Sequence, residues 1–283
     1  MATKYSSTII PTASAFRWIG AMLAAPVAVV ALWLSAPAAH ADEVVVTPFS
    51  SARGAQAPQP WRFTSLPNKT PTRFEVVQEG AQKVLKVEAD QSYGNLVHAT
   101  RVPLNPSTTL AWRWRVDTFV EDANLRTRGG DDGAAKLCVF FDFPAERLSF
   151  GERTRLALAR RTTGEQVPSE ALCYVWDKKE AKGTALVNAF TQRMRMVVLE
   201  SGAAADKAAF VSERRNLLAD YKRAFGDEAG DTLPDVVAVA ISADADNTQG
   251  HGLAYFTDID LRSFATTRSA GFELPPARAG SAE

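Results

Sequence analysis

Apolar and polar side chains alternate along much of this chain, and that period of two restricts what it can fold into. Residues 110–119 show the pattern most clearly, with apolar side chains at every second position: Leu110, Trp112, Trp114 and Val116. The intervening positions carry Ala111, Arg113, Arg115 and Asp117. Because successive side chains of a strand point to opposite faces, this pattern predicts a half-buried antiparallel β-strand.

Three more runs are rich in β-branched or aromatic residues and are separated by Gly, Pro or Asn: residues 73–78, 84–89 and 96–102. Further strands are predicted at residues 134–142, 172–177, 193–200, 236–243 and 254–262. The stretch 236–241 is apolar on both faces, which predicts a central strand. About ten short strands separated by turn residues predict an all-β, or mainly β, fold. We expect a two-sheet antiparallel β-sandwich of jelly-roll type with one or two short helices.

Helical signals are few. Ser212 has the side chain of an N-cap, apolar residues follow it at helical spacing, and Gly226 comes directly after Phe225. These features predict a helix from Ser212 to Phe225. A second helical turn or two is predicted within residues 151–160.

Length and composition favour a single domain. The chain has 283 residues, of which 46% are hydrophobic and 23% charged, as is ordinary for a globular protein. We assign the domain to residues 42–265 and predict a disordered tail at 266–283, where Pro, Gly, Ala and Ser leave little to bury. The formal net charge is zero, so bulk electrostatics give no reason to expect nucleic acid as a partner.

The start of the chain has the pattern of a secretory signal. Lys4 and Arg17 precede an uncharged apolar run at residues 18–34, and residues 39–41 supply the small-x-small motif of a cleavage site. Residues 1–41 are therefore predicted to be a cleavable signal peptide. The mature chain is then expected to be periplasmic or secreted.

An uncleaved anchor helix is the alternative, because about 17 apolar residues can just span a bilayer. Pro37 ends the apolar run, and the acidic pair Asp42 and Glu43 follows the cleavage motif. Both features favour cleavage, which leaves the mature chain without a membrane span.

Two cysteines, Cys138 and Cys173, are present in the mature chain. An oxidising compartment permits a disulfide between them. Both also lie in apolar, strand-like runs, where a buried free cysteine behaves as a small hydrophobe. The sequence leaves both alternatives open.

Basic and aromatic side chains provide the first candidate site. The candidate ligand-binding residues, including two carboxylates, are Arg113, Arg115, Asp131, Asp132, Lys136, Trp176, Arg193 and Arg195. Each arginine pair shares one strand face, so neighbouring strands would form a basic row, joined by Lys136 and flanked by Trp176. Guanidinium groups and aromatic rings together suit sugars or anionic groups. The alternative is an ordinary solvated face whose arginines pair with Asp and Glu.

Carboxylates gather in two polar loops. Asp131 or Asp132 could act with Asp117, Glu121 or Asp246 as acid and base in glycoside hydrolysis, or could instead form a turn or a salt bridge. Asp244, Asp246 and Asn247 supply several oxygen atoms in one short loop, as calcium requires. A β-turn stabilised by its own side chains gives the same pattern. No other cofactor is predicted.

Five phrases occur in order along the chain: residues 110–116; 130–132 with 134–141; 172–176; 213–216 with 220–221 and 225–226; and 243–248 with 254–259. Together they resemble a bacterial family known as domain of unknown function 3047, over residues from about Phe49 to Ser263. The resemblance implies an exported, β-rich domain with no assigned activity. Cys138 and Cys173 depart from the family pattern, so a disulfide is not a family trait. The last predicted strand also resembles that of galactose-binding-like jelly rolls, many of which bind carbohydrate.

Three functions fit these observations. The first is a binding protein whose sheet face or rim loops hold a glycan or another polar component of the cell envelope. The second is a carbohydrate-active hydrolase or lyase that uses Asp131, Asp132 and Asp246. The third is a non-catalytic structural partner in an envelope complex, with the helix at 212–225 as the contact. Binding is the leading hypothesis because of the fold pattern together with the Arg, aromatic and Asp groups described above; the sequence has no nucleophile elbow, phosphate loop or dinucleotide motif.

Overall fold

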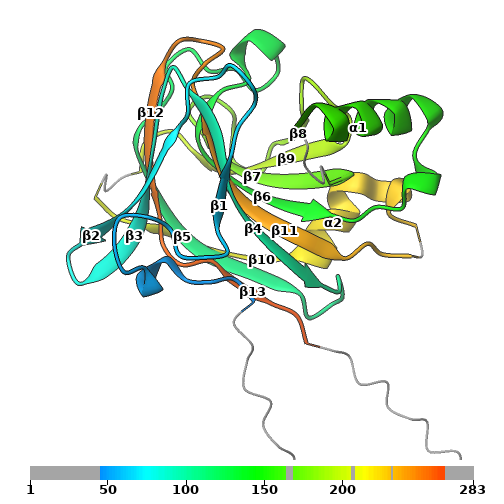
Figure 1. The fold of residues 1–283 in the computed structure, drawn as a ribbon, viewed down its shortest axis with the longest axis horizontal. Helices are drawn as coiled ribbons and strands as arrows, with labels where there is room; N and C mark the ends of the chain where they lie inside the picture. Colours follow the sequence, from blue (N-terminus) through cyan, green and yellow to red (C-terminus); the bar gives the residue numbers. More distant parts are fainter. Residues whose placement is uncertain (1–44, 164–167, 205–207, 231, 265–283) are drawn as a thin grey trace, which may run out of the picture. The chain divides into compact units, whose positions relative to one another are not determined.

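Two β-sheets make up the fold of this chain (Figure 1). The computed structural model describes residues 45–163, 168–204, 208–230 and 232–264, and within them it contains thirteen strands and two α-helices. Sheet A has the strand order β1 (Arg62–Thr64), β4 (Tyr93–Val102), β11 (Val236–Asp244), β6 (Gly133–Phe141), β7 (Glu170–Asp177), β9 (Met194–Ser201) and β8 (Ala185–Val187). Sheet B has the order β10 (Val211–Asn216), β5 (Thr109–Thr118), β12 (His251–Phe256), β3 (Gln82–Asp90) and β2 (Arg73–Glu79), and β13 (Asp260–Arg262) also pairs with β5.

The inward faces of the two sheets carry large aromatic side chains. Trp112 of β5 lies 5.4 Å from Tyr174 of β7 between ring centroids, and Trp114 lies 5.7 Å from Trp176. All four side chains are buried, so these rings join sheet B to sheet A across the core. The mainly β sandwich predicted from the sequence is thereby confirmed.

Strand β11 lies between β4 and β6 in sheet A, as its two apolar faces predicted. The strand pairs are antiparallel apart from β7 with β9, which is parallel. The chain leaves β7, forms the edge strand β8 and then places β9 between them, so β9 takes the direction of β7. The turn between β8 and β9, residues 188–193, lines the site described below.

The helix predicted from Ser212 begins later than expected. Residues Val211–Asn216 form β10, which pairs with β5 along its whole length, and helix α2 (Leu217–Phe225) follows. Asn216 is the true N-cap, because its side chain accepts a hydrogen bond from the backbone N–H of Ala219 at 2.9 Å. Gly226 ends the helix with a φ of 52°, a conformation that favours glycine.

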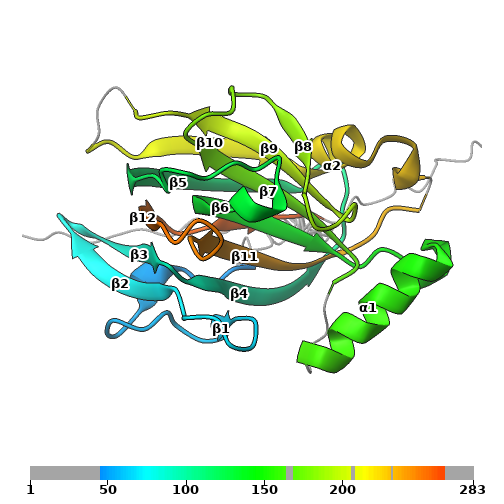
Figure 2. The same cartoon turned by 90° about the horizontal axis from the view of Figure 1, so that it is seen from above.

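The other helix is longer than predicted. Helix α1 (Phe150–Thr163) is part of the connection from β6 to β7 and lies outside sheet A (Figure 2). Its side chains include Phe150, which is 81% exposed.

The run 254–262 was predicted as one strand but forms two. Strands β12 and β13 follow each other along β5 and are separated at residues 257–259. Between β12 and β13, Thr257 remains paired with Arg113 of β5. Its backbone N–H donates to the Arg113 carbonyl at 2.9 Å, and its hydroxyl accepts from the backbone N–H of Arg113 at 3.0 Å.

Two predictions fall outside the described residues: the signal peptide at 1–41 and the tail at 266–283. In the part of the chain that the structure describes, no helix has the length and apolar character needed to cross a membrane.

Candidate functional site

A cavity of about 580 Å³ opens on the outer face of sheet A. It is bordered by helix α1, by the short 3-10 helix Arg128–Gly130 and by the turn 188–193. Phe140 and Met194, which point away from the sandwich core, contribute to its apolar lining. We call this cavity the α1 pocket.

An aromatic ring and a guanidinium group meet at the edge of the α1 pocket. Phe190 is 55% exposed, and the Arg128 guanidinium carbon lies 5.6 Å from the centroid of its ring. The Arg128 Nε also donates a hydrogen bond to the carbonyl of Ala189 at 3.0 Å. These two contacts fix the position of the Arg128 side chain relative to the turn.

Arg193 belongs to the same pocket but is already paired. It donates to Glu170, which is almost fully buried, and to Glu228 at 2.6 Å. Burial raises the pKa of the Glu170 carboxyl, and the hydrogen bond from Tyr221 at 2.7 Å opposes that rise. Arg193 therefore holds the base of the pocket together, whereas Arg195 lies beyond its lining, paired with Glu228 at 3.0 Å.

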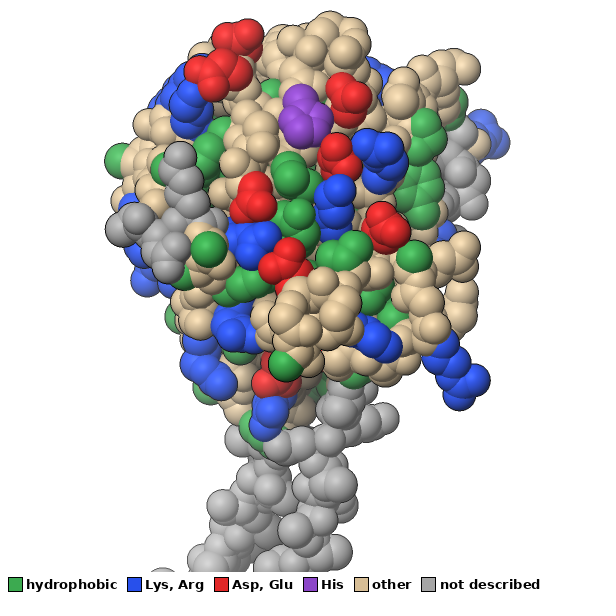
Figure 3. Space-filling model, turned by 90° about the vertical axis from the view of Figure 1, so that its left-hand side faces the viewer, with side chains coloured by type: hydrophobic (Ala, Val, Ile, Leu, Met, Phe, Trp, Pro, Cys, Tyr) green, Lys and Arg blue, Asp and Glu red, His purple; other side chains and the backbone are tan. Residues whose placement is uncertain are grey.

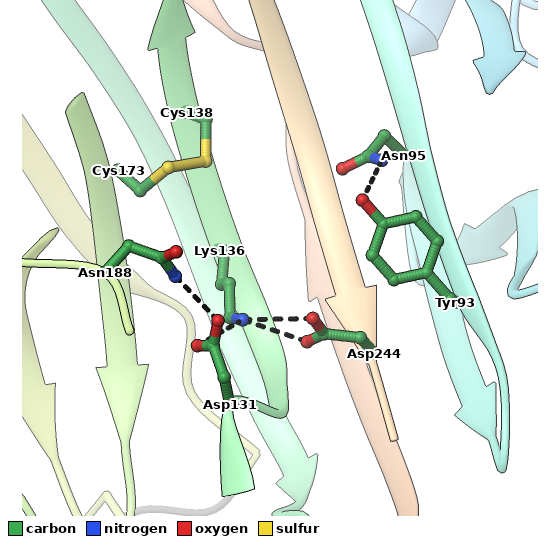
Figure 4. Close-up of a disulfide and its surroundings, with 8 residues drawn as sticks. All are labelled: Tyr93, Asn95, Asp131, Lys136, Cys138, Cys173, Asn188 and Asp244. Carbon is green, nitrogen blue, oxygen red and sulfur yellow. Dashed lines mark hydrogen bonds and ion pairs between the residues drawn. A yellow bond between two sulfur atoms is a disulfide. The ribbon is translucent and has the colours of Figure 1, made fainter. Parts of the chain in front are cut away.

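A buried ion cluster of Lys136, Asp131 and Asp244 lies next to Asn188, which belongs to the pocket lining (Figure 4). The Lys136 Nζ is 3.0 Å from Asp244 Oδ1 and 3.7 Å from Asp131 Oδ1, and all three residues are buried. Burial alone would lower the pKa of the Lys136 ammonium, but the charges of Asp244 and Asp131 outweigh it and hold that pKa above its usual range. Lys136 is thus a permanent cation within the fold.

Asn188 connects the ion cluster to the α1 pocket. Its side-chain Nδ2 donates to Asp131 Oδ2 at 2.6 Å, and its Oδ1 accepts from the backbone N–H of Phe190 at 2.9 Å. Asn188 also contributes to the pocket lining. The carboxylate behind the pocket and the ring at its edge are therefore joined by one amide.

Asp132 and the loop that follows β11, residues 245–250, form a structural unit. Asp132 is completely buried, and it accepts two hydrogen bonds from Thr248, each 2.7 Å long, and others from Asn247. Asp246 pairs instead with Lys69. Asp132 thereby ties the loop after β11 to the start of β6.

The candidate calcium ligands, Asp244, Asp246 and Asn247, do not form a metal-binding cluster. Asp244 is paired with Lys136, and Asp246 points to Lys69. Within the described residues, no group of three or more His, Cys, Asp or Glu side chains is arranged to hold a metal ion.

Cys138 and Cys173 are joined by a disulfide between β6 and β7. The bond lies on the outer face of sheet A, near the ion cluster (Figure 4), and Leu125 packs in the same buried group. The free-thiol alternative therefore does not describe this structure.

The predicted basic row does not form, because the two arginine pairs belong to different sheets. Arg113 and Arg115 are on β5 in sheet B, whereas Arg193 and Arg195 belong to sheet A and its preceding turn. Trp176 does not flank either pair on a surface, since its ring is part of the core.

Arg115 is enclosed by its neighbours on the outer face of sheet B. It is only 8% exposed, with its guanidinium carbon 4.3 Å from the Tyr255 ring centroid and its Nε bonded to Asp117 at 2.7 Å. Arg113 lines a second, smaller cavity of about 400 Å³ with Lys83 and Asp258. Figure 3 shows the side of the molecule where β12, β3 and β2 lie, with basic and acidic side chains intermixed.

A carboxylate pair was missed in the sequence. Glu213 on the inward face of β10 lies beside Glu200 of β9, which is paired with Lys182. Burial, and then the neighbouring charge of Glu200, raise the pKa of Glu213 to about 7. The residue was assigned to the first turn of a helix, and that assignment concealed its inward position.

The main pocket residues also lacked a sequence signal. Arg128 and Phe190 are far apart in the chain and neither lies in a periodic run. The one available hint was an aromatic residue among small and polar neighbours at 188–192.

Comparisons with known proteins bear on which family this chain belongs to. No curated protein matches this chain. The model of a family described as "Protein of unknown function (DUF3047)" matches residues 59–260, which include every residue that lines the α1 pocket. The resemblance inferred from five phrases of the sequence is confirmed, and the chain belongs to the DUF3047 family.

Proposed function

We propose that this chain is an exported binding protein that holds a saccharide in the α1 pocket. The observation that carries the proposal is the pocket itself, about 580 Å³ in volume with the exposed ring of Phe190 at its edge. Pockets for small ligands typically have volumes of roughly 300–1,000 Å³.

The lining of the α1 pocket offers apolar surface and hydrogen-bonding groups, and a sugar ring needs both. Phe190 and Phe140 offer apolar surfaces for the C–H face of a pyranose ring. Gln192 brings an amide group, which can donate to or accept from sugar hydroxyls. A ligand with one apolar face and a polar rim matches this mixture.

Export is supported by two independent features. The first 41 residues have the basic, apolar and small-x-small order of a signal peptide. The disulfide between Cys138 and Cys173 is of the kind that persists in an oxidising compartment. Fractionation of the native host, with mass analysis of the mature protein, tests this part. A mature chain that retains residues 1–41 in the cytosol would contradict it.

Binding is favoured over hydrolysis because the predicted catalytic carboxylates are engaged elsewhere. Asp132 is buried under hydrogen bonds from the loop after β11, and Asp246 is paired with Lys69. A role for the helix as a partner contact is likewise not favoured, since Tyr221 and Phe225 of α2 pack against Phe141 in the core.

A glycan array followed by titration calorimetry on the mature chain tests saccharide binding. We expect Phe190→Ala to weaken binding roughly tenfold, equivalent to about 1.4 kcal/mol of lost stacking and burial. Phe63→Ala is the matched control, because Phe63 is 44% exposed on β1, at the opposite edge of sheet A. The proposal fails if no neutral or acidic saccharide binds, or if both variants bind as the wild type does.

A further inference from the structure

The charged residues of the α1 pocket are unequally paired. Arg193 contacts Glu170, and it also lies 3.7 Å from Glu152. Arg128, at the edge of the pocket, has no ion pair with any residue in the described part of the chain. It is the pocket cation that lacks an anionic partner there.

Two contacts orient the Arg128 side chain, which is otherwise exposed. Its Nε donates to the Ala189 carbonyl, and its guanidinium carbon lies over the Phe190 ring. A guanidinium group has five N–H donors, so its two terminal nitrogens retain four of them. Those nitrogens form the fork that binds a carboxylate or sulfate through two parallel hydrogen bonds.

The ion cluster supports this arrangement from behind. Asp131 directly follows the 3-10 helix that carries Arg128, and it is bonded to Asn188, which in turn is bonded to Phe190. Lys136 lies on the far side of Asp131. The 3-10 helix and the turn 188–193, which together position the Arg128 guanidinium, are thus both joined to the buried Asp131 carboxylate. Such support orients a binding group before the ligand arrives.

We infer that the saccharide bound in the α1 pocket carries an anionic group, a uronic acid carboxylate or a sulfate ester, and that Arg128 binds it. The inference rests on the proposed function, and it adds the chemical class of the ligand. A neutral sugar would leave the terminal nitrogens of Arg128 without a charged partner, whereas an anion completes the pairing. The anion lies beside the Phe190 ring, so the same ligand uses both groups.

Titration calorimetry with matched ligands tests the inference. Uronic acid trisaccharides are compared with their methyl esters, in which one added methyl group removes the carboxylate charge, and a third arm uses sulfated saccharides. We expect the acid to bind at least tenfold more tightly than its ester, with an affinity that falls as salt is raised. Stronger binding of the sulfated arm would assign the anion to sulfate and would also support the inference.

Arg128→Gln supplies the second test. This variant is expected to reduce the acid-to-ester affinity ratio to near one, while Arg113→Gln, on sheet B, retains the wild-type ratio. Circular dichroism and thermal melting establish that both variants fold. An ester that binds as tightly as the acid, or an unchanged ratio in Arg128→Gln, would overturn the inference alone. Absence of binding by every saccharide would overturn the proposed function as well.

Discussion

The side-chain amide of Asn188 lies 2.6 Å from the Asp131 carboxylate and connects two segments that are 57 residues apart. One segment carries Arg128, and the other carries Phe190. The buried Asp131 carboxylate is therefore joined to the Arg128 segment by the backbone and to the Phe190 segment by a single amide, without itself lining the pocket.

Removal of that amide should weaken saccharide binding. Asn188→Ala loses the hydrogen bonds to Asp131 and to the Phe190 backbone, so the edge of the pocket becomes less well ordered. We expect affinity to fall roughly fivefold, equivalent to about 1 kcal/mol. Calorimetry measures this change, and Asn95→Ala, which loses only a bond to Tyr93 on the same face of sheet A, is the control. Equal affinities of the two variants would contradict this role for Asn188.

Loss of the Lys136 ammonium should destabilise the fold. Lys136→Met leaves Asp244 and Asp131 buried without their cation, which costs about 3–5 kcal/mol. The double variant Lys136→Met, Asp244→Leu should recover part of that loss, because one uncompensated charge is also removed. Urea unfolding gives both values. A single variant that loses less than about 1 kcal/mol would show that the cluster contributes little.

The disulfide should stabilise the chain by restricting its unfolded state. Cys138 and Cys173 are separated by 35 residues, and closing a loop of that order contributes about 2–4 kcal/mol. The double variant Cys138→Ala, Cys173→Ala should unfold at a correspondingly lower guanidinium concentration. The wild type in reductant should move in the same direction. Coincident unfolding midpoints for variant and wild type would refute this contribution.

Glu213 should make stability depend on pH. Its folded pKa of about 7 lies above the usual value of 4.5, so the folded state binds the extra proton between these pH values. The stability contributed by the protonated form is complete below pH 4.5 and is lost as pH rises through 7. Glu213→Gln should therefore be more stable than the wild type at pH 8.

The expected gain is on the order of 1 kcal/mol, since solvent screens a half-buried group. At pH 4 the gain should be absent. Thermal melts across this range test the prediction, with Glu75→Gln, at an exposed position on β2, as the control. A variant whose melting temperature follows the wild type at every pH would exclude a raised pKa at Glu213.

Most strands could be predicted from the sequence, because the apolar positions within each run mark the face that the strand buries. Residues 110–119 are an example, since Trp112 and Trp114 point inward as expected. Residues 212–216 were misassigned because an edge strand with exposed Ser212 and Arg214 has the same polar residues as the start of a helix. The pairing with β5 decides between the two structures, and it depends on distant residues.

The candidate site was harder to predict, because its residues meet only through the tertiary fold. Lys136 was grouped with arginines, yet it is paired with Asp244 and Asp131. The α1 pocket depends on the turn that follows the edge strand β8, and the order β7, β9, β8 cannot be read from local pattern. Arg128 and Phe190 therefore remained unnoticed.

The edge strands of both sheets determine how readily copies of this protein can pair at high concentration. Sheet A ends in β1 and β8, each only three residues long, and sheet B ends in β2 and β10, whose exposed positions include Arg73, Glu75 and Arg214. Short or charged borders offer few free backbone groups to a neighbouring copy. Concentrated solutions of this protein should therefore resist edge-to-edge polymerisation into fibrils.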